Sequence, residues 1–396
     1  MRTPSVRQIM PGSNREMVRK HTGSSLALAA EVPRRCNLGR DSGRPCTRGA
    51  NLRSPRESNK EELEAIGAEV ATRYRDLRKR PLSVAIMGQT GVGKSSLLNA
   101  MFAANLEVGH ARPTTKQPTP LSVRSNEGHE IIFWDLPGIG ESESADAGYL
   151  DVYADLLLGC DVAIWACHVD NRSTLQDVRT LDALLSGRSI DQRRLLLSRL
   201  TFILTKADVL SNPSWIYALD GNSGTFAPPK AVTGRLEERE RYFEEVLLAP
   251  HYQELVSRTY VTGRFSGRKL SILSEVAGHR LEIEGRELIC HGYVTDQVEK
   301  RLLARFPDTS EVWQRLRENH RVISCSSIFN YDLTRVLAAI LNKLGWESVA
   351  RFADVIEKTE NISDIPFDTA RHLSNIVVWD RRTERPIYDL KTAEIR

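Results

Sequence analysis

The sequence lacks several features that would assign it to common protein classes. It has no run of about 18 apolar residues, so it offers no candidate transmembrane helix. None of its six cysteines belongs to a CxxC pair, and the spacing of a zinc site is absent. We therefore interpret the cysteines as reduced thiols of a cytoplasmic protein. Four of them are expected to be small buried side chains: Cys160, Cys167, Cys290 and Cys325.

The first 59 residues lack Phe, Trp and Tyr but contain eleven Arg. A segment of this composition cannot bury enough surface to offset its ordering entropy, so we expect a disordered tail. Its Arg and Ser content and its few acidic residues also fit a transit peptide. A secretory signal fits less well, because the apolar stretch at 25–30 is short. An upstream extension from an over-long gene prediction is a third alternative.

Basic charge is concentrated in this tail. Residues 1–59 carry twelve Lys/Arg and four Asp/Glu, a net charge of +8, whereas the whole chain carries +4. The remaining residues therefore sum to −4. A general nucleic-acid surface would need its basic excess on the folded part, so nucleic-acid binding is not supported.

Hydrophobic patterning predicts an α/β fold. Five apolar stretches are typical of buried strands, and they lie at 82–87, 130–134, 161–167, 200–204 and 321–325. Helical patterns follow or separate them, including 95–102 and 333–344. Continuous apolar strands alternating with helices indicate a mostly parallel sheet covered by helices on both faces. An amphipathic helix over 60–79, ended by Pro81, is predicted to precede the first strand.

These patterns predict a chain organised in four parts. They are the tail at 1–59, an N-terminal helix at 60–80, a main domain at 81–345 and a C-terminal extension at 346–396. The main domain carries an insert within 209–320. In and around it we expect a loop at 212–230, a helix at 235–258, a hairpin at 281–294 and one or two helices at 298–317. Residues 375–391 are predicted to form a further hairpin.

A phosphate-binding loop follows the first strand directly. The sequence GQTGVGKS matches G-x-x-x-x-G-K-[ST], in the required order of strand, loop and helix. Its glycines let backbone N–H groups converge on phosphate oxygens, and the helix N-terminus adds partial positive charge. Lys94 is predicted to reach the β- and γ-phosphates, Ser95 to ligate Mg²⁺, and Ser96 to contact the α-phosphate. The other nucleotide-binding positions of the loop are Gly88, Gln89, Thr90, Gly91, Val92 and Gly93.

Two further motifs end later strands. In DLPG, Asp135 is placed to hold Mg²⁺ through water, and Gly138 allows its N–H close to a γ-phosphate. In TKAD, the carboxylate of Asp208 can accept hydrogen bonds from guanine N1–H and N2–H₂. Adenine lacks this donor pair and would leave the carboxylate unpaired. The Lys206 stem is expected to lie along the base plane.

Taken together, residues 82–345 resemble a P-loop GTPase of the translation-factor-related class, in its septin-like and Era-like group. The resemblance implies the three-layer P-loop NTPase fold, binding of GTP or GDP with Mg²⁺, and hydrolysis of GTP. It assigns Thr115, with Thr114 in reserve, to Mg²⁺ and γ-phosphate sensing, and it lets Thr205 hydrogen-bond the P-loop. After strand RVISC, Ser326 and Ser327 resemble the motif whose middle N–H meets guanine O6. The implied catalytic residues are Lys94, Thr115 and Gly138.

The chain departs from this family pattern at three places. Ile139 follows DLPG where Ras-type enzymes have the water-orienting glutamine, which resembles a hydrophobic-substituted branch of the family. Gly91 stands where potassium-activated relatives carry asparagine. The 118 positions between Asp208 and Ser326 exceed the usual single helix with short loops.

The main hypothesis is a GTP-hydrolysing switch whose segments 105–119 and 136–148 are ordered by the γ-phosphate and Mg²⁺. Hydrolysis would be slow without an activating protein or a homodimer. The alternative is an assembly or scaffold protein that GTP stabilises with negligible turnover. His168 and His110 are weak candidates for orienting water. Residues 346–396 contain no glycine, which argues against an RNA-binding KH module with its G-x-x-G loop and leaves ribosome contact unsupported.

Overall fold

The structure is a computed structural model in which the chain divides into two units, residues 1–80 and 81–396. The described residues all lie in the second unit. They are 81–102, 118–136, 153, 156–171, 174–261, 267–284, 287–353, 355, 362–370, 372–373, 376–382 and 385–387. The predicted tail at 1–59 and the predicted helix at 60–79 therefore lie outside the described residues.

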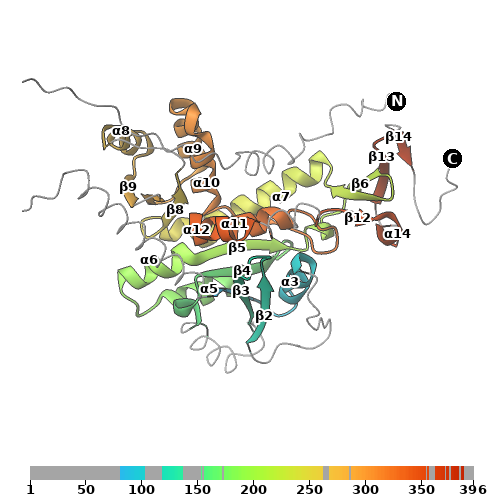
Figure 1. Ribbon diagram of the computed structural model, residues 1–396, viewed down its shortest axis with the longest axis horizontal. Helices are drawn as coiled ribbons and strands as arrows, with labels where there is room; N and C mark the ends of the chain where they lie inside the picture. The colour runs from blue at the N-terminus through green and yellow to red at the C-terminus, as the bar shows by residue number, and fades with distance from the viewer. Residues whose placement is uncertain are drawn as a thin grey trace, which may run out of the picture. The chain divides into compact units, whose positions relative to one another are not determined.

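A six-stranded sheet forms the centre of the second unit, in the order β11-β5-β4-β1-β3-β2 (Figure 1). All neighbouring pairs are parallel except β2 with β3. The strands are β1 (Leu82–Gly88), β2 (Thr119–Arg124), β3 (Glu130–Asp135), β4 (Val162–His168), β5 (Leu200–Thr205) and β11 (Ile323–Ser324). The five predicted strands are confirmed, although the last is shorter than predicted.

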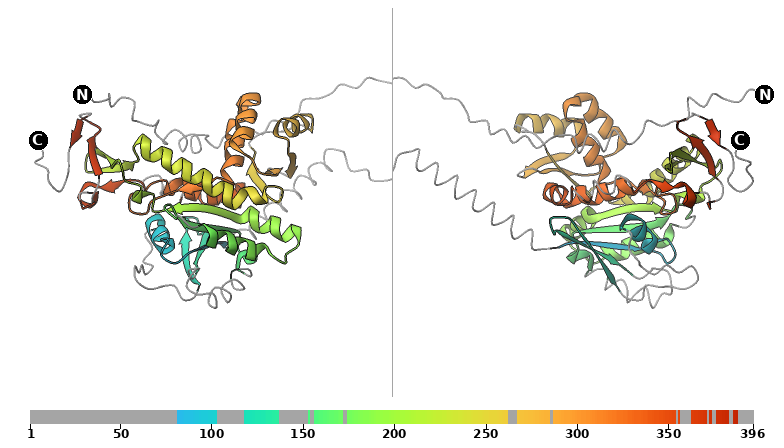
Figure 2. Two further views of the ribbon diagram at one scale, coloured as in Figure 1. Left: turned by 180° about the vertical axis from the view of Figure 1, so that it is seen from behind. Right: turned by 45° about the vertical axis from the view of Figure 1, so that its right-hand side comes forward.

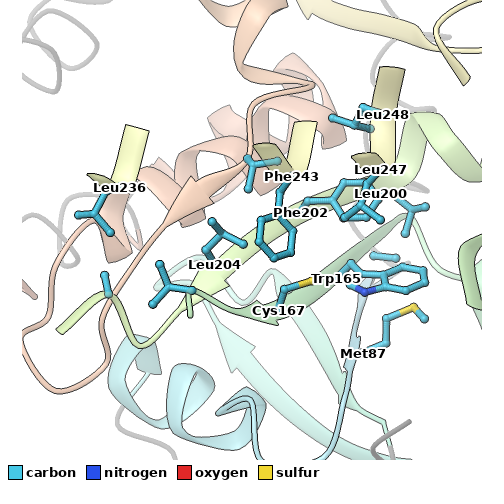
Figure 3. Packing of buried hydrophobic residues seen from close by; sticks show 14 of the residues in the cluster. Met87, Trp165, Cys167, Leu200, Phe202, Leu204, Leu236, Phe243, Leu247 and Leu248 are labelled. Atoms are coloured by element: carbon cyan, nitrogen blue, oxygen red, sulfur yellow. The ribbon is translucent and has the colours of Figure 1, made fainter. Parts of the chain in front are cut away.

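Successive side chains of the central strands point to opposite faces of the sheet, and each face has its own hydrophobic core. Val84 and Ile86 face the core that α3 (Lys94–Phe102) and α11 (Leu333–Leu344) complete. The intervening Ala85 and Met87 face the opposite core, to which three helices contribute: α5 (Leu175–Leu185), α6 (Ile190–Arg199) and α7 (Lys230–Phe243). Figure 3 shows this second core between strand residues such as Trp165 and Phe202 and the α7 residue Phe243. Helices on both faces of a mostly parallel sheet confirm the predicted α/β P-loop fold.

The insert builds a small subdomain with its own core, which we call the insert subdomain. Its antiparallel sheet has the order β8-β10-β9, with β8 (Val256–Tyr260), β9 (Arg280–Glu284) and β10 (Glu287–His291). The helices α8 (Gly267–Ala277), α9 (Asp296–Arg305) and α10 (Ser310–Glu318) pack with it around Leu288 and Trp313. The predicted hairpin at 281–294 and the helices at 298–317 are thus confirmed.

The predicted helix at 235–258 is only partly correct. The helix α7 begins at Lys230, continues into a π-helical turn η3 (Glu244–Leu248) and ends in a short 3₁₀ turn η4 (Ala249–His251). Pro250 cannot supply the N–H that a continuing helix needs, and the chain turns into β8. In Figures 1 and 2, the end of α7 lies near the insert subdomain, and its start lies near a five-stranded sheet.

The prediction of a loop at 212–230 is wrong. This stretch contains the hairpin of β6 (Trp215–Asp220) and β7 (Ser223–Ala227), which the Gly-, Ser- and Pro-rich composition concealed. The hairpin joins a sheet of order β12-β7-β6-β13-β14, whose other strands are β12 (Ile365–Pro366), β13 (Ile376–Asp380) and β14 (Arg385–Ile387). The pairing of β13 with β14 confirms the predicted C-terminal hairpin.

The structure also shows the state of the cysteines and the length of the apolar helices. The four cysteines in the described part are free and buried, as predicted. Among the described residues, no helix has both the length and the apolar character needed to cross a bilayer.

Candidate nucleotide-binding site

The P-loop lies between β1 and α3, at the carboxyl edge of the central sheet. Gly88 ends β1 with a φ of +141° and pairs with Ala166 of β4. A Cβ atom at this position would lie 2.1 Å from the Ala166 carbonyl oxygen, so only glycine fits. Gly91 and Gly93 have φ values of +79° and +100°. These left-handed turns let successive amide groups point into one concave loop, the geometry that binds phosphate.

Lys94 spans the mouth of this loop. Its side chain is 7% exposed, and Nζ donates to the carbonyl oxygens of Gly88 at 3.1 Å and Gln89 at 3.3 Å. The ammonium group is therefore held at the start of the loop by two backbone carbonyl oxygens. A cation in this position fits an incoming phosphate, because charge-assisted hydrogen bonds to phosphate oxygens are stronger than those to neutral carbonyls.

The predicted metal-binding side chains Ser95 and Asp135 are in direct contact. Ser95 Oγ donates to Asp135 Oδ2 at 2.6 Å, although 40 positions separate the two residues. Asp135 ends β3 and is 2% exposed. A hydroxyl and a carboxylate oxygen are the hard ligands that Mg²⁺ prefers, so the pair fits that ion. Thr115 and Gly138, predicted for the same region, lie outside the described residues.

Residues of the TKAD motif are bound to the P-loop. Thr205 Oγ1 donates to the carbonyl oxygen of Val92 at 2.5 Å and lies 3.0 Å from that of Cys167. Lys206 has a left-handed φ of +58°, and its Nζ donates to Gly91 O at 2.7 Å. The stem of this lysine thus extends from the end of β5 toward the loop.

The two predicted base-recognition segments also meet. Ser326 Oγ donates to Asp208 Oδ1 at 2.5 Å and accepts from the N–H groups of Ile328 and Phe329 at 3.2 and 3.1 Å. The backbone N–H of Ala207 donates to Cys325 O at 3.0 Å. Ser327 lies within the turn that these hydrogen bonds close. The structure therefore brings a carboxylate and the turn at 326–329 to the same place, 118 positions apart in the sequence.

Sequence reasoning missed one carboxylate next to the P-loop. Asp177 of α5 is 1% exposed and accepts hydrogen bonds from Gln89 Nε2 at 2.7 Å, Trp165 Nε1 at 3.0 Å and Asn171 Nδ2 at 3.1 Å. Burial raises the pKa of Asp177, while the hydrogen bonds from Trp165 and Gln89 act in the opposite direction. In sequence it resembles any acidic residue in a first helical turn, so no local signal identifies it.

A cavity of about 410 Å³ lies against the P-loop. Its lining comes from the loop and from the end of β4: Gln89, Thr90, Gly91, Val92, His168, Asp170 and Asn171. His168 Nδ1 accepts from the N–H of Asp170 at 3.0 Å. Burial, and then the charge of Lys206, lowers the pKa of His168, so the ring is neutral at pH 7 with its proton on Nε2. His110, the other histidine candidate, lies outside the described residues.

Comparison with known proteins gives the domain type. Residues 83–198 match the sequence profile of the 50S ribosome-binding GTPase family. Residues 83–198 thus have the sequence of a GTPase domain. It is similar to the uncharacterized protein YkfA of Escherichia coli, with 37% identity over 24% of this chain and 33% of that protein. It is also similar to GTPase Era of Geotalea daltonii, with 26% identity over 38% of this chain and 50% of that protein.

The chain thus spans between a third and a half of the length of these two relatives. Among solved structures, the chain is similar to Toc33 from Arabidopsis thaliana in complex with GDP and Mg²⁺. This likeness has a TM-score of 0.33 and 19% identity, and it covers 48% of this chain and 70% of that one.

Proposed function

We propose that this protein binds GTP at the P-loop and hydrolyses it to GDP and phosphate as a conformational switch. The observation that carries the proposal is the direct bonding of four sequence segments far apart in the chain. Hydrogen bonds join the P-loop to the TKAD motif, α3 to the end of β3, and TKAD to the turn after β11. The residues that we assign to the phosphates, to Mg²⁺ and to the base therefore lie along one edge of the sheet.

We assign the phosphate side to the P-loop and its neighbours. Lys94 would release its carbonyl partners and bind the β- and γ-phosphates, and Ser96 would contact the α-phosphate. Ser95, Asp135 and Thr115 would hold Mg²⁺, which neutralises developing charge on the phosphate oxygens when bound. The N–H of Gly138 would bind the γ-phosphate, so that its loss on hydrolysis frees segments 105–119 and 136–148.

We assign the base side to Asp208 and the turn after β11. Asp208 would accept from guanine N1–H and N2–H₂, and the N–H of Ser327 would donate to guanine O6. Ser326 already holds the Asp208 carboxylate in a fixed orientation through the 2.5 Å hydrogen bond, which reduces the ordering needed on binding. Lys206 would cover one face of the base while it remains bound to Gly91 O.

We infer that unassisted hydrolysis is slow. Ile139 cannot orient water, and even a Ras-type enzyme without its activator hydrolyses GTP at only about 10⁻⁴ s⁻¹. An activating protein or a second copy of this chain would supply the missing group, consistent with a hydrophobic-substituted member of the septin-like and Era-like group. His168 is the candidate within the chain, because its Nε2–H belongs to a ring that lines the same cavity as the P-loop.

Single-turnover hydrolysis of GTP tests this proposal. We expect phosphate release that requires Mg²⁺, and a rate per molecule that rises with protein concentration or with an added activator. Lys94→Ala should abolish GTP binding and release while leaving the fold intact, whereas Lys230→Ala, an exposed lysine at the start of α7, should behave as wild type. Binding without Mg²⁺-dependent release would favour the assembly or scaffold alternative. Unchanged GTP affinity of Lys94→Ala would refute the phosphate site.

A further inference from the structure

The strand β11, which leads into the base-reading turn, lies at the edge of the central sheet. It pairs with β5 through Ile323 and Ser324, and Cys325 N donates to Leu204 O at 2.7 Å. Because N–H groups alternate along a strand, those of Val322 and Ser324 point away from β5. Buried edge groups of this kind need partners from another element.

Two glutamates of one helical face provide these partners. Glu240 Oε1 accepts from Ser324 N at 2.9 Å, and Glu244 Oε1 accepts from Val322 N at 3.2 Å. The two glutamates are four residues apart, at the end of α7 and the start of η3, so they lie one turn apart on the same face. Their carboxylates take the place that a further strand would occupy beside β11.

Glu244 is in turn fixed by the insert subdomain. Its Oε2 accepts from Arg317 Nη2 at 2.6 Å and from Tyr293 Oη at 2.8 Å. Arg317 is 2% exposed, and its Nε donates to Asp296 Oδ1 at 2.8 Å. A buried ion pair with these hydrogen bonds holds its geometry tightly, because breaking one partner leaves an uncompensated charge. The insert subdomain is thus connected to β11 through the Glu244 carboxylate.

We propose that Glu240 and Glu244 are positioning residues for guanine recognition, and that through Glu244 the insert subdomain sets how firmly the base is held. The inference rests on the proposed guanine site. Ser324 lies two residues before Ser326, whose hydroxyl orients Asp208. A shift of β11 would therefore move the turn at 326–329 and the Asp208 carboxylate together. Both glutamates act through β11 and not by touching the nucleotide.

The dissociation rate of a fluorescent GDP derivative from the full chain tests this role. Glu240→Asp keeps the charge but shortens the side chain by one methylene, so it should lose the bond to Ser324 N. We expect about tenfold faster release, which corresponds to about 1.4 kcal/mol. Glu240→Gln keeps an oxygen at the same reach and should stay within about threefold of wild type. The control is Glu238→Gln, an exposed glutamate on the same helix, which should not differ from wild type.

A second measurement separates positioning from a general loss of structure. Glu240→Asp should lower the preference for GDP over inosine diphosphate, which lacks the 2-amino group, while the affinity for tripolyphosphate stays unchanged. Glu244→Gln keeps the bond to Val322 N but weakens the link to Arg317, and it should also speed GDP release. If wild type binds no GDP, the proposed function fails. If wild type binds GDP, and Glu240→Asp and Glu244→Gln both release it at the wild-type rate, this inference fails and the proposed function stands.

Discussion

Gly88 offers a sharp test of the P-loop geometry. The residue ends β1, its φ of +141° is in the region that favours glycine, and its neighbour across the sheet is Ala166. In Gly88→Ala, the new Cβ atom would lie 2.1 Å from Ala166 O, whereas ordinary van der Waals contact begins near 3.4 Å. The two strands must therefore separate by about 1.3 Å at this point, or the chain must leave its φ value.

The cost follows from these two effects. Overpacking of a buried site costs about 1–3 kcal/mol, and an unfavourable backbone conformation costs a further 1–3 kcal/mol or so. We expect Gly88→Ala to lower the free energy of unfolding by about 2–6 kcal/mol, the sum of the two costs. Gly91→Ala is the matched control, because Gly91 has a φ of +79° but no atom within 4 Å of its added Cβ. That variant should carry the backbone cost alone, about 1–2 kcal/mol.

Urea denaturation without nucleotide, followed by tryptophan fluorescence, measures both variants. The midpoint of Gly88→Ala should lie well below that of Gly91→Ala, with equal slopes. Equal destabilisation of the two variants would refute the close approach of β1 and β4 at the start of the P-loop.

Two other predictions concern the buried interior. Burial lowers the pKa of His320 well below its usual range, so below about pH 6.5 only the unfolded chain takes up this proton. Stability is therefore lost as pH falls, by up to about 1.4 kcal/mol per pH unit from this residue. The variant His320→Phe should flatten the decline in urea midpoint between about pH 6.5 and 4.5. Substitution of the exposed His372 is the control and should leave that decline unchanged. Phe329 stacks on Phe226 with ring centroids 4.2 Å apart, so Phe329→Ala should lower the free energy of unfolding by about 3–4 kcal/mol. The exposed Tyr252→Ala should change it by less than about 0.5 kcal/mol, and a loss below about 1 kcal/mol at Phe329 would contradict the packing.

The central sheet and the motif positions could be predicted because their signals are local. Strands such as Leu82–Gly88 and Leu200–Thr205 are continuous apolar runs, and the P-loop glycines are required by a backbone geometry that few sequences satisfy. Strand order then brings the ends of β1, β3 and β5 to one edge of the sheet. The meeting of Ser95 with Asp135 follows directly from that order.

The missed features depend on distant partners. The hairpin β6–β7 resembles a loop in sequence because its stretch is rich in Gly, Ser and Pro. Its strand β6 pairs in parallel with β13, whose first residue follows the last residue of β6 by 156 positions. Strand formation there depends on tertiary pairing more than on local propensity.

Glu240 and Glu244 illustrate the same limit for side chains. They lie in the highly charged sequence RLEERERYFEEV, where nothing separates them from glutamates on a solvated face. Only the position of β11 beside α7 makes two of these carboxylates acceptors for backbone N–H groups.

The central claim is that Asp208 reads guanine beside an intact phosphate cradle. Equilibrium binding of GDP, xanthosine diphosphate and ADP to wild type and Asp208→Asn tests it most directly. Two hydrogen bonds to a carboxylate distinguish guanine, so wild type should prefer GDP over the other two nucleotides by at least about 100-fold. An amide at position 208 can donate to the C2 carbonyl of xanthine, so the variant should prefer xanthosine diphosphate. Equal GDP affinity of Asp208→Asn and wild type would contradict the account.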